Sequence, residues 1–214
     1  LGYGSALYSF ASRFEREVGD SNQPGSLIDR TIAFENALLT AASNPSAAQR
    51  LETVAETADA VAKKLNVLSD SVQEARETAD RTIGVQVDRI NDTMKRLERI
   101  NDRVRTASNA GGDTASLLDE RQRLLDGISE IVPLRIVQRD QGQISVYTRS
   151  GATLLDLSAT EIGFSPTGYI TADMSLGSGL SGLTLNGEPI VSAGGGMFAG
   201  GDMAAQFEIR DTVA

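Results

Sequence analysis

The sequence predicts an α+β protein: an elongated antiparallel α-helical bundle with a very long central helix, plus an inserted small β-rich domain. Apolar residues recur at helical spacing from Asn44 to Ala110 with almost no helix-breaking residue, and after Pro133 the apolar spacing changes to two. Glycine usage shifts at the same point, because thirteen of the 21 glycines lie from residue 142 to residue 201. We therefore expect an α-helical rod domain formed by residues 1–132 and 201–214, and a β-rich domain formed by residues 133–200.

Two shorter helices are expected before the long one. Apolar residues at helical spacing between Leu1 and Val18 predict an amphipathic helix, and the glycines and the proline of residues 19–25 predict a turn. Ser26 followed by Asp29 forms a capping-box pattern, which predicts the start of a second helix that Asn44 ends.

The long helix has a predicted start and a predicted apolar seam. Asn44 followed by Pro45 predicts a cap with proline at the first helical position, and Ser46 with Gln49 offers an alternative capping box. At about 1.5 Å per residue the helix would be roughly 90 Å long, so the protein is expected to be partly rod-shaped. The seam, spaced by threes and fours as in a coiled coil, consists of Leu51, Val54, Ala58, Val61, Leu65, Leu68, Val72, Ala75, Ala79, Ile83, Val87, Ile90, Met94, Leu97, Asn101 and Val104.

Two positions interrupt this seam. Around Gly84 the spacing becomes consecutive steps of four, which unwinds a coiled coil locally. Because a helical glycine also costs about 1 kcal/mol relative to alanine, we expect a bend there. Asn101 places an amide on the apolar seam, where it either fixes register as a buried polar residue or faces solvent near a frayed end.

A further helix over residues 114–131 is expected to fold back along the distal part of the long helix, because the Gly111-Gly112 connection is short. Alternating apolar residues then predict a hairpin formed by residues 134–136 and 144–148. Short strands are expected at residues 153–157, 162–165, 169–171 and 182–185, and Asn186-Gly187 predicts a tight turn into residues 189–191. After a glycine-rich loop, Asp202 is expected to cap a last helix that ends at Val213.

Composition excludes most catalytic and metal chemistry. The chain has no cysteine and no histidine, so thiol nucleophiles, thiolate metal sites and the usual general base are absent. The net charge of −9 and the sequence pI of about 4.6 argue against a nucleic-acid partner. No apolar run is long enough to predict a membrane anchor. We predict no enzyme activity, no catalytic residue, no metal and no cofactor.

Two glycine-rich segments resemble nucleotide-binding loops in their residue pattern but not in their predicted structural context. Residues 177–182 match G-x-G-x-x-G, but a dinucleotide site needs a helix beginning at the third glycine, whereas residues 183–187 are typical of strand and turn. Residues 194–201 lack the Lys-Ser/Thr of a phosphate loop, and Asp202 would repel an anion there. We interpret both as loops, the second as a flexible connection.

Charged residues on the helices are interpreted as surface groups. Asp92 with Arg96, and Glu77 with Arg81, have the spacing of ion pairs worth a few tenths of a kcal/mol (about 0.2–0.5). The adjacent carboxylates at 119 and 120 point about 100° apart on a helix and cannot share one substrate face.

A series of motifs along the chain resembles one known family. The motifs are Asn44-Pro45-Ser46, Arg50, Ile90-Asn91, Ile100-Asn101, Leu117-Leu118-Asp119-Glu120-Arg121-Gln122-Arg123-Leu124-Leu125, and Gly195-Gly196-Met197-Phe198-Ala199-Gly200 ahead of Arg210-Asp211. Together they are similar to the core of the flagellar hook-associated protein 1 family, the first hook–filament junction proteins. The chain departs from the family pattern at Gln122, where aspartate is usual, and it resembles a core fragment that lacks both terminal segments.

The resemblance implies a structural subunit of the bacterial flagellum, extracellular and exported by the flagellar type III system. Such a subunit forms the junction between hook and filament, as an adaptor on which the second junction protein and then the filament assemble. The implied partners are copies of itself in the junction ring, the hook protein, the second junction protein and an export chaperone bound through the missing terminus. The residues expected to act in packing and register are Asn44, Pro45, Arg50, Asn91, Asn101, Leu117, Leu118, Asp119, Arg121, Leu124, Leu125, Arg210 and Asp211.

Two functions from other classes fit the same long helix. An extracellular ligand-binding region of a coiled-coil sensory receptor would need a flanking transmembrane segment in the full-length gene. A secreted hydrolase on a helical stalk would have to work with carboxylates alone.

Overall fold

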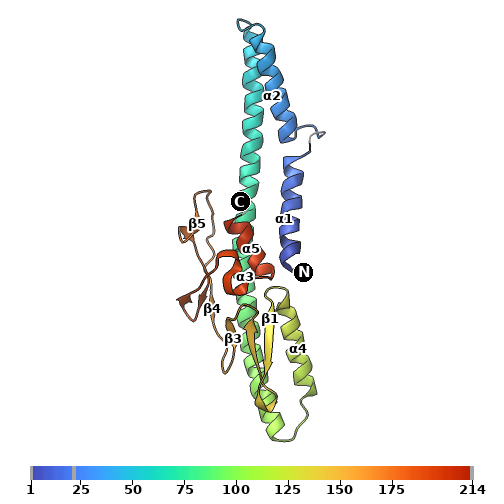
Figure 1. Cartoon of the computed structure of the whole chain (residues 1–214), viewed down its shortest axis with the longest axis vertical. Coiled ribbons are helices and arrows are strands. Elements are labelled where there is room, and N and C mark those ends of the chain that lie inside the picture. Colours follow the sequence, from blue (N-terminus) through green and yellow to red (C-terminus); the bar gives the residue numbers. More distant parts are fainter. Residues whose placement is uncertain (1, 21–22, 213–214) are drawn as a thin grey trace. The chain divides into compact units, whose positions relative to one another are not determined.

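The computed structural model describes residues 2–20 and 23–212, and it confirms the predicted fold class of a helical protein with one very long helix and a small β region (Figure 1). Its α-helices are α1 (Gly2–Val18), α2 (Leu27–Ala42), α3 (Ala48–Asn109), α4 (Ala115–Ser129) and α5 (Asp202–Asp211). Between α4 and α5 lie the strands β1 (Leu134–Gln138), β2 (Ile144–Thr148), β3 (Thr153–Leu155), β4 (Ile162–Gly163), β5 (Ser175–Leu176), β6 (Gly179–Leu180), β7 (Thr184–Leu185) and β8 (Glu188–Pro189).

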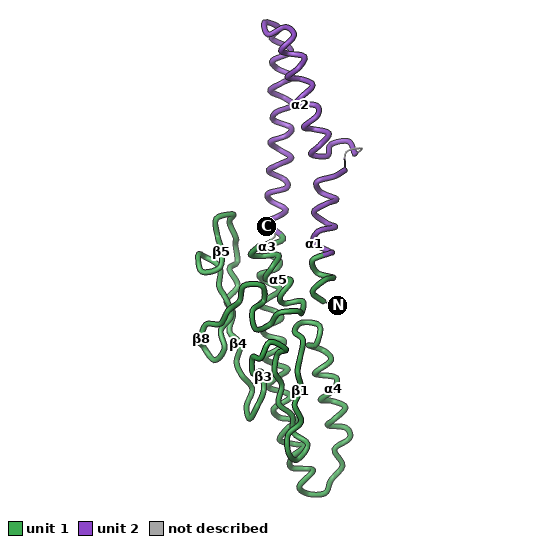
Figure 2. Tube along the Cα trace, viewed as in Figure 1, with its two compact units in different colours: residues 1–7, 75–214 green, residues 8–74 purple. Residues whose placement is uncertain are grey.

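Contacts divide the chain into two compact units, coloured in Figure 2. Unit 1 comprises Leu1–Leu7 and Ala75–Ala214, and unit 2 comprises Tyr8–Glu74, so α1 and α3 each contribute to both. The domain boundaries predicted at residues 133 and 200 were placed where the secondary structure changes, which is a different criterion from contacts. They stay a prediction.

Unit 2 contains α2 and the first part of α3, and its helix ends show which capping predictions were right. The Ser26 hydroxyl accepts a hydrogen bond from the Asp29 N–H at 3.1 Å, so the predicted cap of α2 is confirmed. Arg50 Nη1 donates to the Thr40 carbonyl at 2.8 Å, which places a cation at the C-terminal end of α2. Residues 21 and 22, inside the predicted turn before α2, lie outside the described residues.

The predicted start of the long helix was wrong by three residues. The Asn44 carbonyl accepts from the Ala47 N–H at 3.2 Å, and this turn delays the helix until Ala48. Pro45 therefore lies in the connecting turn and not at the first helical position. The Ser46 hydroxyl donates to Asn44 Oδ1 at 2.9 Å, and within the described residues it accepts no hydrogen bond from the Gln49 N–H, so the alternative capping box does not form either.

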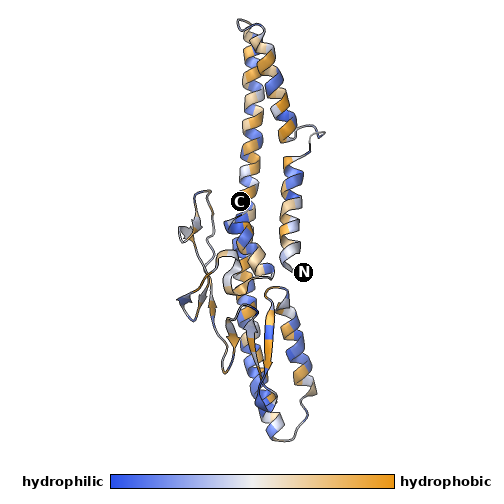
Figure 3. Ribbon diagram, viewed as in Figure 1, coloured by the Kyte–Doolittle hydropathy of each residue, from blue (hydrophilic) through white to orange (hydrophobic). Residues whose placement is uncertain are grey.

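The apolar seam is only partly covered within unit 2. Leu51 and Leu65 are 52% and 50% exposed, whereas Leu68 is 7% exposed. Apolar residues likewise recur along α2 (Figure 3), but its buried positions are only the small residues Ala37 and Ala41.

Unit 1 contains the main hydrophobic core, and there the seam prediction is confirmed. Every seam position from Ala75 to Val104 is buried. Leu117 of α4 packs with Ile100 and Val104 of α3, so α4 folds back along α3 as expected. The core joins α3, α4, the strands and α5, and consists of Ile83, Val87, Ile90, Met94, Leu97, Leu125, Ile128, Ile131, Val132, Ile144, Val146, Leu154, Leu155, Ile162, Leu183, Phe198, Met203 and Phe207.

The β region is a set of short pairings on α3. β1 and β2 form the predicted antiparallel hairpin, with Leu134 opposite Thr148 and Gln138 opposite Ile144, and β3 pairs with β2. β4, β7 and β8 form a second antiparallel sheet, whose β7–β8 turn has Asn186 and Gly187 at φ values of 49° and 86°, as the predicted tight turn requires. The predicted strand at residues 169–171 was wrong, because these residues are irregular and their backbone groups bond to side chains of α3. The pair β5–β6 was not predicted.

The glycine-rich segment before α5 is packed tightly, which differs from the flexible connection expected. A Cβ atom at Gly196 would lie 1.7 Å from the Val191 carbonyl oxygen, so only glycine fits between these backbones. Asp202 does not cap α5, because Gly201 holds the N-cap position and Asp202 is the first helical residue. The expected helix end at Val213 lies outside the described residues.

Gly84 permits a close contact within unit 1. α3 continues through Gly84 as one helix, and a Cβ atom there would lie 2.8 Å from Pro166 Cγ. The glycine therefore makes room for the segment that follows β4, a role that the seam pattern did not indicate.

We expect Gly84→Ala to lower the free energy of unfolding by about 1 kcal/mol, since overpacking costs about 1–3 kcal/mol and helix propensity returns about 1 kcal/mol. Gly127→Ala in α4 is the matched control, because its Cβ would meet only the flexible end of Arg89 at 3.5 Å. Urea unfolding followed by circular dichroism should show opposite signs for the two variants. A stabilising Gly84→Ala would contradict the close contact.

Candidate functional site

Two asparagines on α3 hold the β segments of unit 1 by the same geometry. Asn101 Nδ2 donates to the Ile144 carbonyl at 2.8 Å, and its Oδ1 accepts from the Ile144 N–H at 3.1 Å. Asn91 makes the same two bonds to Ile162, at 2.8 and 2.9 Å. Each side-chain amide thus makes the pair of hydrogen bonds that a neighbouring strand would make to the first residue of β2 or β4. Asn101 is 4% exposed, so the solvent-facing alternative for this residue was wrong.

A buried ion cluster lies where α5 meets α3. The Arg210 guanidinium is fully buried and bonds to Asp80 at 2.8 Å and to Asp211 at 2.6 Å. Its central carbon lies 4.9 Å from the ring centre of Phe207 and 5.6 Å from that of Phe164. Burial lowers the pKa of Arg210, but the hydrogen bonds that it donates to Asp211 and Asp80 outweigh this effect, and the pKa is raised overall. The cation is therefore kept charged between two carboxylates.

Arg76 extends this cluster to the irregular backbone of the β region. It is 4% exposed and donates to the carbonyls of Arg210 at 2.8 Å, Thr171 at 3.0 Å and Met174 at 2.6 Å. The second carboxylate oxygen of Asp80 accepts from the Thr167 N–H at 2.5 Å. Residues 167–174, which have almost no strand pairing of their own, are thus held by charged side chains of α3.

Sequence reasoning missed Arg76 and Asp80. A signal was present, because each directly follows a seam alanine, Ala75 or Ala79, where the small side chain leaves room for other groups. A charged residue beside an apolar seam is normally interpreted as a surface residue. Here the hydrogen-bond partners of Arg76 and Asp80 lie about ninety or more positions away in the chain, and local sequence patterns carry no information about such distant contacts.

The structure does not gather the predicted packing residues into one place. Asn44, Pro45 and Arg50 lie in unit 2, and the others lie in unit 1. Of the α4 block, Leu117 and Leu125 are buried and Leu124 is half-buried, whereas Leu118 and Asp119 are exposed. The predicted register roles of these residues stay a prediction.

Arg121 of α4 reaches the tip of the first hairpin. Its Nη1 donates to the Gly142 carbonyl at 2.7 Å, and partial burial lowers the pKa of Arg121. The contact ties the β1–β2 turn to α4. The neighbouring Gln122 bonds along the helix to Asp126 at 2.8 Å.

These hydrogen bonds and ion pairs hold the β segments and α5 of unit 1 against α3 and α4. Within residues 2–20 and 23–212 there is no group of three or more acidic, histidine or cysteine side chains that could hold a metal ion. None of the helices in this described part is long and apolar enough to cross a membrane. Residues 177–182 comprise the turn after β5, the two-residue strand β6 and the two residues that follow it; they lead into no helix, so this G-x-G-x-x-G sequence is not a dinucleotide-binding motif.

Comparison with known proteins accounts for this fold. The family model described as the flagellar hook-associated protein FlgK helical domain matches residues 12–214. The chain belongs to this family. It is also 22% identical over 153 residues to flagellar hook-associated protein 1 of Escherichia coli strain K12, a match that covers 71% of this chain and 28% of that protein.

A solved FlgK structure has the same fold. The flagellar hook junction protein FlgK from Burkholderia pseudomallei superposes with a TM-score of 0.78 at 17% sequence identity, over 96% of this chain and 36% of that one. The chain therefore spans about a third or less of the length of these FlgK proteins. None of these matches supports the sensory-receptor alternative.

Proposed function

We propose that this FlgK-family chain is the structural core of a subunit that forms the junction between the flagellar hook and filament. The observation that carries the proposal is the family match across residues 12–214, on a chain in which the buried side chains of Asn101 and Arg210 bind its own backbone and its own carboxylates. In this role the subunit is an adaptor on which the second junction protein and then the filament assemble. It works without catalysis.

The proposal includes the partners and the location. The subunit would be exported by the flagellar type III system and lie outside the cell, in contact with copies of itself, with the hook protein and with the second junction protein. An export chaperone would bind outside the described core. The helical parts, residues 1–132 and 201–214, would pack against neighbouring subunits, and residues 133–200 would face outward. The thirteen predicted packing residues would act within the subunit.

Deleting the gene in the source bacterium should leave hooks without filaments, with flagellin lost to the medium. Electron microscopy of the cells and immunoblots of the culture supernatant measure both effects. Complementation with the intact gene is the control and should restore filaments. Filaments of normal number and length in the deletion strain would overturn the proposed function.

A further inference from the structure

A groove of about 370 Å³ lies between α3 and α4 in unit 1 and is lined by three arginines. Arg89 and Arg96 come from α3, and Arg123 comes from α4. Asp92 is the one carboxylate among its lining residues, so the groove is positively charged on a chain whose net charge is −9. Such a local reversal of sign attracts acidic groups.

The three arginines of the groove are not neutralised by the protein itself. Among the ion pairs formed by the described residues, none includes Arg89, Arg96 or Arg123, and the Asp92–Arg96 pair expected from spacing does not form. Glu77 and Arg81, by contrast, form their predicted pair at 3.8 Å. Arg123 makes one long hydrogen bond, 3.4 Å from its Nε to the Asp119 carbonyl of its own helix.

The groove also has a polar residue on its floor that is nearly buried and has no partner. Thr93 is 7% exposed, and no hydrogen bond from its hydroxyl is formed within the described part of the chain. Other threonines of α3 return this bond to their own helix, as Thr82 does to Thr78 at 2.7 Å and Thr106 to Asp102 at 2.9 Å. The Thr93 hydroxyl is therefore available to a group that enters the groove. Gly127 on the α4 side adds no side chain to fill it.

The spacing of the arginines selects the kind of ligand. Arg89 and Arg96 are seven residues apart, which is two turns or about 10 Å along α3. Carboxylates two turns apart on a second helix match this spacing. Arginine also binds carboxylates through two parallel hydrogen bonds.

We propose that this groove is the docking site for an acidic helical segment of a neighbouring subunit in the flagellar axis. The inference rests on the proposed function and specifies which surface and which chemistry make one subunit contact. The Arg89 and Arg96 guanidinium groups bind carboxylates two turns apart on the docked helix, Arg123 closes the groove from α4, and Thr93 donates to the nearer carboxylate.

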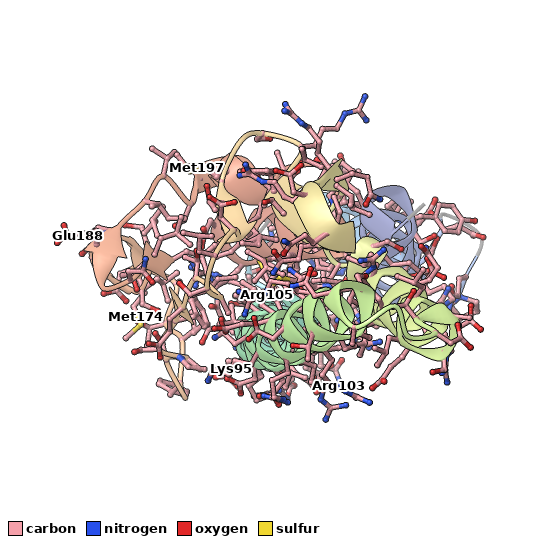
Figure 4. All side chains as sticks on the ribbon, turned by 90° about the horizontal axis from the view of Figure 1, so that it is seen from below. Lys95, Arg103, Arg105, Met174, Glu188 and Met197 are labelled. Carbon is pink, nitrogen blue, oxygen red and sulfur yellow. The ribbon has the colours of Figure 1, made fainter. Side chains whose placement is uncertain are left out.

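The test uses the full-length protein and a helical alanine-based peptide with glutamates at positions i, i+4 and i+7, compared with the same peptide carrying glutamines. Titration calorimetry should detect binding of the glutamate peptide, at least tenfold tighter than the glutamine peptide and weaker at high ionic strength. Arg96→Glu should weaken binding at least tenfold. Arg103→Glu is the matched control and should change it less than twofold, because Arg103 lies on α3 outside the groove and projects outward in Figure 4.

Unchanged urea midpoints will show that both variants are folded, as expected for exposed arginines. Equal binding of the two peptides, or equal losses in Arg96→Glu and Arg103→Glu, would overturn the docking site. Neither result bears on the deletion phenotype, so failure of this inference is distinguishable from failure of the proposed function.

Discussion

Replacing Arg210 with methionine should lower the free energy of unfolding by about 3–5 kcal/mol, because removing one partner of a buried ion pair leaves an uncompensated charge. Asp80, whose side chain is 2% exposed, would keep its carboxylate in the core without the cation 2.8 Å away. Methionine keeps most of the side-chain volume, so the loss reports on charge more than on a cavity. Urea unfolding of wild type and variant measures the difference.

Two comparisons separate this effect from a general sensitivity to mutation. Arg139→Met removes a cation from an exposed pair, where the two side chains are 49% and 42% exposed, and should give a much smaller change. Adding Asp80→Leu to Arg210→Met should restore part of the lost stability, since the more deeply buried of the two carboxylates that lost their cation is then removed. Similar losses in Arg210→Met and Arg139→Met would show that the buried ion cluster contributes no more to the free energy of unfolding than an exposed ion pair does.

Asn101→Leu should cost about 2–6 kcal/mol, because the N–H and the carbonyl of Ile144 both lose a buried partner and each unsatisfied group costs about 1–3 kcal/mol. Asn91→Leu is the matched variant. It removes the same two bonds, here to Ile162, but Asn91 is half-buried and water can replace part of the loss, so a smaller cost is expected. Amide hydrogen exchange should show that Ile144 loses protection in the first variant and Ile162 in the second.

The double variant tests whether the two asparagines act separately. They are ten residues and about 15 Å apart along α3, a distance at which mutational effects usually add within about 0.5 kcal/mol. A double variant no less stable than Asn101→Leu alone would show that β2 and β4 detach together and not one by one.

The sequence was sufficient for features that depend on local periodicity. The seam from Ala75 to Val104, the fold-back of α4 and the β1–β2 hairpin each follow from apolar spacing, and the structure confirms them. Asn101 could be singled out as a polar residue on an apolar seam, but its partner could not, because Ile144 is far away in the chain and is met only after the hairpin folds onto α3.

Features that depend on distant packing were missed or misread. The close approach of Pro166 to Gly84 was missed, and the bend expected at Gly84 stays a prediction. The segment around Thr171 had the composition of a strand, but Arg76 already binds its carbonyl, so strand pairing is not needed there. The start of α3 was misplaced because a turn closed by Asn44 and Ala47 outcompeted a proline that was otherwise suited to begin a helix.

The two asparagines also fix how the β region is distributed around the long helix. Ten residues of α-helix fall about 80° short of three whole turns, so Asn91 and Asn101 point to different sectors of the circumference. The chain between Ile144 and Ile162 must travel both along and around α3 to reach both amides. Adding or removing one residue between positions 91 and 101 would turn one amide by about 100° and release its strand. In this stretch the length of the helix is as constrained as its composition, and changes of length are tolerable only elsewhere in the subunit.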